Sequence, residues 1–192
     1  VFEMCNDGLI PVDNPSKMLL SEMSEGVSGT TVTCTLEGTR PMLAEIQALV
    51  TPTGFGNPRR MSAGIDLNRL LLLVAVMEKR VRVNLSNCDV YINVAGGLRI
   101  DETAVDLGIC VAIWASKNDF VIPHDIMFIG EVGLGGELRA VSKLEKRLSE
   151  AHNLGFKTAI VPKQSLRGVN VPDGLTVYGV RSVTDAINYF RG

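Results

Sequence analysis

The sequence predicts one domain of mixed α+β (α/β) structure. Its 192 residues fall within the usual size of a single domain. Apolar residues make up 46% of the chain and charged residues 21%, and this balance excludes intrinsic disorder. Strand patterns come first, and helices alternate with strands later, which is the order expected for such a fold. We expect the domain to cover residues 1–192, with an N-terminal strand or arm over about residues 1–30.

The first half of the chain predicts strands joined by turns. Val1–Val12 has the pattern of a strand or arm that turns at Asn6–Gly8. Thr30–Leu36 is rich in β-branched residues, which favour strands. After a turn at Gly38–Pro41, the polarity of Leu43–Thr51 alternates. This segment is expected to be the antiparallel partner of Thr30–Leu36, with one solvent-exposed face and one buried face.

A Gly/Pro loop and a long helix follow. The loop is Thr53–Arg60 and ends in two arginines. The helix Asp66–Arg80 is apolar on nearly all sides, so we expect it to be buried in the core or in a subunit contact. The other expected elements are strands Val90–Val94, Thr158–Pro162 and Leu175–Val180, a hairpin of Met127–Glu131 with Glu137–Val141, and helices Thr103–Ser116, Lys143–Leu154 and Val183–Phe190. Ser142 precedes Glu145 by three residues, which is the spacing of a capping box at the start of a helix.

Cysteine and histidine spacing argues against a metal site. The four cysteines are Cys5, Cys34, Cys88 and Cys110. No two of them form a C-x-x-C pair, so we interpret them as reduced, packed thiols. The two histidines, His124 and His152, have no further ligand at short spacing, and a zinc site is therefore not expected.

The chain has no segment that predicts a membrane span. Its longest apolar run, Leu70–Met77, is much shorter than the roughly 20 residues that such a span needs. No secretory signal is visible, so we expect a cytoplasmic protein. The chain starts at Val1 and not at Met, and we therefore expect it to be a fragment of a longer protein.

Charge is unevenly distributed along the chain. The formal net charge is −2, which by itself suggests no preference for nucleic acid. Residues 1–37 contain six acids and one base, residues 58–82 contain six bases and two acids, and residues 139–147 contain four bases and one acid. Segregated charge of this kind can attract a polyanion even when the total charge is close to zero.

Common catalytic motifs are absent from the sequence. It contains no G-x-x-x-x-G-K-[ST] phosphate loop, no G-x-S-x-G nucleophile turn and no H-E-x-x-H metal motif. The loop Gly133–Gly136, with glycine at 133, 135 and 136, is better explained by a hairpin turn than by a nucleotide-binding loop. Motifs alone therefore predict a domain without a visible catalytic site.

Segments between Asn93 and Lys163 resemble the proteolytic domain of the Lon family, which has the ribosomal protein S5 domain 2-like fold. They are Leu107–Ile109, Gly130–Glu131, Gly136–Leu138 and Thr158–Pro162. In that family a serine acts as nucleophile and a lysine in the helix after the hairpin acts as its base. The resemblance places Asp106 at the serine position and Arg147 at the lysine position, with Lys146 as its neighbour.

This departure from the Lon pattern argues against peptidase chemistry. A carboxylate cannot form the acyl-enzyme of a Ser–Lys peptidase, and a guanidinium cannot accept a proton at neutral pH. We expect Asp106 and Arg147 either to form an ion pair between two helices or, for Asp106, simply to favour a helix N-terminus. An active peptidase would need another nucleophile, for which Ser142 and Ser62 are the candidates.

A wider resemblance is to the bacterial RadA (Sms) family of RecA-related DNA-repair ATPases. It rests on Glu37–Pro41, Gln47–Val50, Pro58–Arg60, Asp66–Leu70 and Gly130–Leu134. The resemblance implies a non-proteolytic, C-terminal Lon-like domain of a hexamer that processes recombination intermediates. It also implies that ATP, Mg and Zn bind in a missing N-terminal part, with none of them in this fragment, and that the recombinase RecA is a partner.

Binding to branched or duplex DNA, without sequence specificity, is the first function implied. Outward-reaching cations supply most non-specific affinity for phosphates. The candidates are Arg59, Arg60, Arg82, Arg139, Lys143, Lys146 and Arg147. Because aromatic residues make up only 5% of the chain, stacking on single-stranded bases is not the expected mode. The alternatives are an active Lon-type peptidase and a purely structural ring-forming domain without DNA contact.

Overall fold

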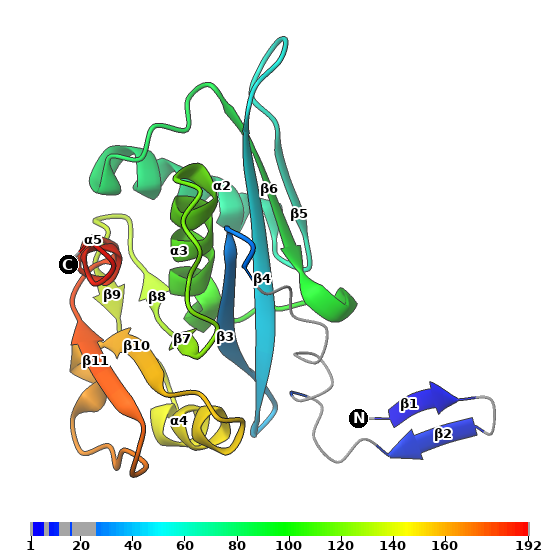
Figure 1. The fold of residues 1–192 in the computed structure, drawn as a ribbon, viewed down its shortest axis with the longest axis vertical. Helices are drawn as coiled ribbons and strands as arrows, with labels where there is room; N and C mark the ends of the chain where they lie inside the picture. Colours follow the sequence, from blue (N-terminus) through cyan, green and yellow to red (C-terminus); the bar gives the residue numbers. More distant parts are fainter. Residues whose placement is uncertain (1, 6–7, 12–15, 17–25, 192) are drawn as a thin grey trace.

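The computed structural model describes residues 2–5, 8–11, 16 and 26–191, and a seven-stranded sheet forms its centre (Figure 1). The strands, in their order across the sheet, are β11 (Thr176–Val180), β10 (Thr158–Pro162), β7 (Ile126–Phe128), β3 (Thr30–Glu37), β4 (Arg40–Pro52), β6 (Cys88–Val94) and β5 (Arg60–Ala63). The first four of these strands run parallel, β3–β4 and β4–β6 are antiparallel, and β5 is parallel to β6. The predicted mixed α and β fold is thereby confirmed.

Two small hairpins lie outside the central sheet. β1 (Phe2–Cys5) pairs with β2 (Gly8–Pro11), as the predicted N-terminal arm required, although the expected turn residues Asn6 and Asp7 lie outside the described residues. The predicted hairpin of Met127–Glu131 with Glu137–Val141 is confirmed only near its turn, because Met127 and Phe128 belong to β7 of the central sheet. It pairs β8 (Glu131–Val132) with β9 (Leu138–Arg139).

Helices cover both faces of the sheet. They are α2 (Leu67–Val76), which continues as a π-helical turn η1 (Met77–Val81), α3 (Asp106–Lys117), α4 (Leu144–Asn153) and α5 (Val183–Asn188). Shorter 3₁₀ turns are η2 (Ala95–Gly97), η3 (Thr103–Val105) and η4 (Lys163–Leu166). None of the helices in the described residues is long and apolar enough to cross a membrane.

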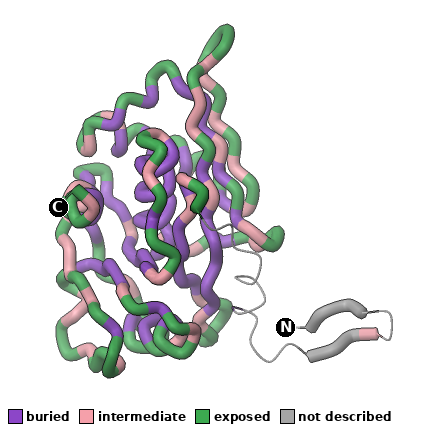
Figure 2. Tube along the Cα trace, in the orientation of Figure 1, coloured by how far each residue is buried: buried purple, intermediate pink, exposed green. Residues whose placement is uncertain are grey.

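The core is divided by the sheet into two apolar clusters. Helices α2, α3 and α5 pack on the face that carries Ala44, Ile46 and Ala48, and α4 packs on the opposite face with Leu43. α3 is buried along its length from Asp106 to Ser116, as the purple tube at the centre of Figure 2 shows. Neighbouring strand residues alternate between the two clusters because successive side chains of a strand point to opposite faces.

One burial prediction is wrong, and a second is confirmed only in part. The odd-numbered face of β4 was expected to be wet, but Leu43 and Glu45 are buried because α4 lies over this end of the strand. Only from Gln47 onward is that face open. The helix expected to be buried in the core or in a subunit contact lies only partly in the core, since Leu67, Leu71 and Leu72 are 44–45% exposed; the subunit contact stays a prediction. Its inner residues fill the core, and its outer residues have no covering layer in the described residues.

Two local predictions are also wrong. Ser142 does not cap α4, which begins at Leu144 after Lys143 in a left-handed conformation with φ 53°. This positive φ turns the chain just before the helix, so the hydroxyl is not aligned with the first helical N–H groups. Strand β5 (Arg60–Ala63) was not predicted, and its first residue was placed at the end of the loop Thr53–Arg60. Its four residues become a strand through pairing with β6, which the short alternation of Arg60–Ala63 is not enough to predict.

Candidate nucleic-acid interface

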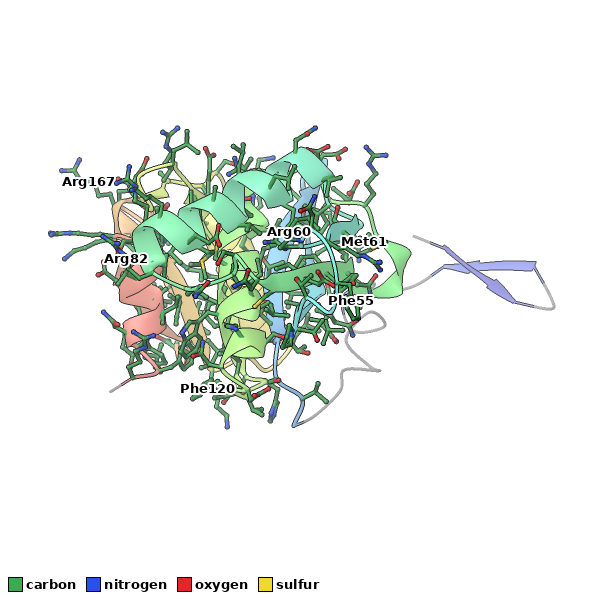
Figure 3. The ribbon with its side chains drawn as sticks, turned by 90° about the horizontal axis from the view of Figure 1, so that it is seen from above. Phe55, Arg60, Met61, Arg82, Phe120 and Arg167 are labelled. Carbon is green, nitrogen blue, oxygen red and sulfur yellow. The ribbon has the colours of Figure 1, made fainter. Side chains whose placement is uncertain are left out.

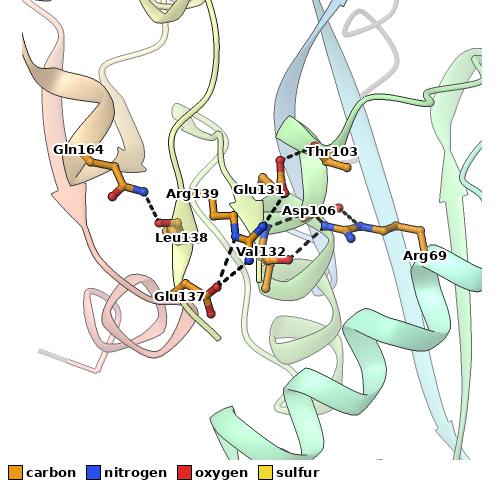
Figure 4. A network of polar contacts seen from close by, with 9 residues as sticks. All are labelled: Arg69, Thr103, Asp106, Glu131, Val132, Glu137, Leu138, Arg139 and Gln164. Carbon is orange, nitrogen blue, oxygen red and sulfur yellow. Dashed lines mark hydrogen bonds and ion pairs between the residues drawn. The ribbon is translucent and has the colours of Figure 1, made fainter. Parts of the chain in front are cut away.

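Asp106 is buried at the start of α3 and binds Arg69 (Figure 4). The Arg69 guanidinium donates to both oxygens of the carboxylate, with Nε 2.9 Å from Oδ1. The backbone N–H of Val132 donates to Oδ2 at 3.0 Å, and Arg69 also donates to the Val132 carbonyl at 3.1 Å. The hydrogen bonds to Asp106 raise the pKa of Arg69. The pair therefore connects α2, α3 and β8.

Arg147 is fully buried and binds Glu102. Its Nη1 donates to Glu102 Oε2 at 3.1 Å and to the carbonyl of Cys34, and its Nε donates to the carbonyl of Ser142 at 3.0 Å. The same Glu102 oxygen accepts the Leu36 N–H at 2.9 Å. This guanidinium therefore fastens α4 to β3 and to the segment before η3.

The predicted Asp106–Arg147 ion pair is wrong. Each of the two residues has its own partner, Arg69 for the acid and Glu102 for the base. Neither partner could be inferred from helix spacing, because both lie far away in the chain and meet their partners only in the folded state. Burial also means that Arg147 cannot reach a DNA phosphate in this structure, so its prediction as a contact is wrong.

Basic residues gather instead in an open cleft of about 740 Å³ between β9, η4 and β11. Its charged lining residues are Arg139, Lys163, Arg167 and Arg181 with one acid, Glu137. Lys163 directly follows β10 and Arg181 directly follows β11. Because β10 and β11 are parallel neighbours, their carboxyl ends meet at one edge of the sheet, where ligands of open α/β sheets usually bind.

Hydrogen bonds to the backbone of β9 hold the walls of this cleft together. The Leu138 N–H donates to the Arg181 carbonyl at 2.8 Å. The side-chain amide of Gln164 donates to the Leu138 carbonyl at 2.7 Å (Figure 4). Gly179 lets η4 lie directly on β11, since a Cβ there would be 2.7 Å from Leu166 Cδ1 and 3.2 Å from Lys163 Cα. The basic side chains therefore start from fixed backbone positions.

Only one of the predicted DNA contacts, Arg139, lines the cleft. Its side chain is 60% exposed and lies 3.3 Å from Glu137 and 3.8 Å from Glu131, so two carboxylates share its charge. Lys143 and Lys146 are exposed beside or on α4 and are not among the lining residues.

The loop arginines behave differently from each other. Arg59 is exposed, whereas the Arg60 guanidinium donates to the carbonyls of Arg59, Cys88 and Leu85 and serves mainly to hold the loop. Arg82, labelled with Arg60 in Figure 3, is exposed with a left-handed φ of 65°. DNA contact by Arg59, Arg82, Lys143 and Lys146 stays a prediction.

Sequence reasoning missed Lys163, Arg167 and Arg181. Their positions did carry a signal, because Lys163 and Arg181 each come directly after a predicted strand. Two such positions converge only if the strands are parallel neighbours, and the strand order was not predicted. The order of the strands therefore brings these basic residues together, and they do not form a cluster of bases in the sequence.

Curated relatives cover the whole chain. It is 51% identical over its full length to DNA repair protein RadA of Halalkalibacterium halodurans and to that of Bacillus subtilis. It is 46% identical over 98% of its length to the RadA of Streptococcus pyogenes. The chain is homologous to part of RadA. It spans 42% of the length of each of these three relatives.

The resemblance to RadA that the sequence suggested is confirmed by these identities, which are high and extend from end to end. A family model described as subunit ChlI of Mg-chelatase also matches residues 73–165. This match runs from α2 to η4 and includes the Asp106 and Arg147 positions. The more specific assignment to a Lon-type fold stays a prediction.

Proposed function

We propose that this chain is the DNA-binding and assembly domain of a RadA-type DNA-repair protein, and that it is a Lon-like domain without peptidase activity. The observation that supports DNA binding best is the cleft of four basic side chains in a chain homologous to RadA. The proposed ligand is the sugar-phosphate backbone of branched or duplex DNA, bound without sequence specificity.

The chemistry of the cleft suits phosphates. Among the described residues, no carboxylate pairs with Lys163, Arg167 or Arg181, in contrast to Arg139. Arginine presents planar forks of donors that match phosphate oxygens, and lysine adds a point charge. Such contacts supply sequence-independent affinity that falls as salt rises.

The buried ion pairs support the absence of peptidase chemistry. Asp106 has no hydroxyl, and its carboxylate is already bound to Arg69 and Val132. Of the alternative nucleophiles, the Ser62 hydroxyl donates to the Ile65 carbonyl at 2.9 Å, and Ser142 is exposed before α4. We expect no cleavage of fluorescent casein, with or without DNA and ATP, and DNA-stimulated cleavage would contradict the proposal.

Properties of the whole protein belong to the same proposal. We infer a cytoplasmic, RecA-related ATPase that forms a hexamer, processes recombination intermediates with the recombinase RecA, and binds ATP, Mg and Zn outside this chain. A purely structural role without DNA contact is the competing function. It predicts no salt-dependent DNA binding by this chain.

The test compares charge reversals at the two ends of β10. The double variant Lys163→Glu, Arg167→Glu changes the cleft, and Lys157→Glu reverses the charge of a 77% exposed lysine just before the same strand. Binding to fluorescent duplex and three-way branched DNA is measured by anisotropy at several salt concentrations. The double variant is expected to weaken binding by about tenfold or more and to lower the salt slope by about 0.9 for each lost contact.

The control variant should bind like the wild-type chain. Equal affinity and equal salt slope for the double variant and the wild-type chain would contradict the cleft as the DNA site. Weakening by Lys157→Glu as large as that of the double variant would show only a general charge effect.

A further inference from the structure

The loop that joins β4 to β5 carries an aromatic side chain without a packing partner. It consists of Thr53–Arg59 and projects beyond the end of the sheet, at the top of Figure 1. Phe55, labelled in Figure 3, lies in this loop and is 99% exposed. The next most exposed large apolar side chain of the described residues is Leu134, at 66%. Phe55 therefore adds almost nothing to the core, although an aromatic ring is among the largest apolar surfaces that a core can bury.

Both ends of this loop are fixed by β6 and the turn before it. β6 lies between β4 and β5 in the sheet, so the loop crosses over the start of β6. The Thr53 N–H donates to the Asn87 carbonyl at 2.9 Å. Asp89 joins the two ends, because its Oδ1 accepts the Thr53 hydroxyl at 2.9 Å and the Arg59 N–H at 2.8 Å. The tip that carries Phe55 therefore starts from fixed backbone positions.

The surroundings of Phe55 are open. A Cβ added at Gly54 or at Gly56 would meet no atom within 4 Å, so no other part of the described chain packs against the tip. Gly56 has a φ of 80°, a left-handed conformation that glycine adopts without strain. Because the side chain of Phe55 is almost fully exposed, a flat ligand can lie against either face of its ring without displacing a neighbour.

The charge of this loop favours a polyanion. Residues 52–60 contain two arginines, Arg59 and Arg60, and no acid. Arg59 is exposed and belongs to none of the ion pairs of the described residues. The acid below the loop, Asp89, already accepts three hydrogen bonds. The Arg59 guanidinium is therefore available to a phosphate, and it belongs to the same short loop as the exposed ring.

A single exposed ring suits a nucleobase better than a protein surface. A stable protein interface buries about 800 Å² on each partner and has a cluster of apolar side chains at its centre. The other residues of the loop are threonine, glycine, asparagine, proline and arginine, so no such cluster surrounds the ring. A nucleobase needs only one ring, because every base offers a π face for stacking. Both faces of a base are covered inside an intact duplex, so the matching ligand is an unpaired base.

We propose that Phe55 stacks on an unpaired base of DNA, while Arg59 contacts a phosphate of the same strand. The inference rests on the proposed DNA binding and adds a preference for unpaired bases, such as those at a branch or a gap. The low aromatic content argues against a series of stacked bases, but one base requires one ring. The loop leads into β5 at one edge of the sheet, and the basic cleft lies at β10 and β11 near the other edge, so the two contacts can be tested separately.

The test separates stacking from apolar contact and from charge. Phe55→Ala removes the ring, Phe55→Leu keeps an apolar side chain without a π face, and Phe55→Trp keeps an aromatic ring. Arg59→Ala removes the proposed phosphate contact, and Leu134→Ala is the matched control at another exposed apolar position. Anisotropy measures binding to a fluorescent oligothymidine and to a duplex of equal length over a salt series. Circular dichroism and urea unfolding should show unchanged stability for the Phe55 variants, because the native ring is not packed.

Phe55→Ala and Phe55→Leu should both bind oligothymidine about five- to a hundredfold more weakly than the wild-type chain, with an unchanged salt slope. Their affinity for duplex should stay within about twofold of the wild-type affinity, because paired bases offer the ring no free face. Arg59→Ala should lower the salt slope on oligothymidine by about 0.7. Phe55→Trp should keep its affinity, and oligothymidine should quench its fluorescence. The chain's single tryptophan, Trp114, is buried, so the wild-type chain should show no such quenching.

Three results would overturn the inference. They are wild-type affinity of Phe55→Ala for oligothymidine, full affinity of Phe55→Leu, which would indicate apolar contact without stacking, and a loss by Leu134→Ala as large as that of Phe55→Ala. An equal loss on duplex and oligothymidine would also contradict a preference for unpaired bases. If the wild-type chain binds duplex through the cleft but does not bind oligothymidine, only this inference fails. If it binds neither DNA, the proposed DNA binding fails as well.

Discussion

Removing either partner of the Glu102–Arg147 pair should destabilise the protein by different amounts. We consider Arg147→Met and Glu102→Met, which keep side-chain bulk but remove the charge. Breaking a buried ion pair by deleting one partner costs about 3–5 kcal/mol. Each loss is a large fraction of the about 5–15 kcal/mol of stability that domains of this size have, so it should shift the unfolding curve clearly.

The structure predicts which variant loses more unfolding free energy. After Arg147→Met, the Glu102 side chain is still 27% exposed and still accepts the Leu36 N–H and the Thr35 hydroxyl. After Glu102→Met, the guanidinium stays 0% exposed and has only neutral carbonyl partners. The free-energy loss is therefore expected near 3 kcal/mol for Arg147→Met and near 5 kcal/mol for Glu102→Met.

A double-mutant cycle measures the pair itself. Urea unfolding followed by circular dichroism gives the unfolding free energy of each variant. The double variant Arg147→Met, Glu102→Met should lose less than the sum of the single losses, with a coupling of about 1–3 kcal/mol. Arg147→Met combined with Asp106→Asn should be additive within about 0.5 kcal/mol. Coupling in the second cycle and additivity in the first would refute the pairing described here.

Three further predictions concern packing, pH and thiol reactivity. Gly179→Ala should cost about 1–3 kcal/mol and weaken DNA binding, because its Cβ would push η4 off β11, whereas Gly54→Ala, with open space around it, should change neither unfolding nor DNA binding. Asp89→Asn should be less stable than wild type at neutral pH. The Arg59 N–H and other donors hold the pKa of Asp89 below its usual value. The ionised carboxylate therefore stabilises the fold above the usual pKa, and this stabilisation is lost as the pH falls through the lowered pKa. Urea midpoints of Asp89→Asn and wild type that differ equally at pH 7 and at about pH 2 would contradict this. Burial raises the pKa of Cys34 to about 12, so a Cys34-only variant should react with a thiol reagent at neutral pH only after urea unfolding, and rapid reaction in the native state would contradict this.

Strong local patterns predicted most elements of the fold. The β-branched run Thr30–Leu36 predicted β3, and the expected helix Thr103–Ser116 corresponds to η3 and α3. β5 was not predicted, because an alternation over only four residues is too short to specify a strand, which forms here by pairing with β6. The start of α4 failed for a related reason, since a single left-handed residue, Lys143, shifted the helix away from its capping sequence.

The candidate site also has features that the sequence predicts and features that only the folded structure shows. The sequence by itself determined that a carboxylate and a guanidinium stand at the Asp106 and Arg147 positions, which is decisive for chemistry because side-chain type sets what a group can donate or accept. It also determined the mixed fold and the relationship to RadA, since both rest on residue identity and order. Only the tertiary structure decided the partners of those two residues and the meeting of Lys163, Arg167 and Arg181 in one cleft. Those contacts join residues distant in the chain, and their distances are set by strand order and packing, which no local pattern encodes.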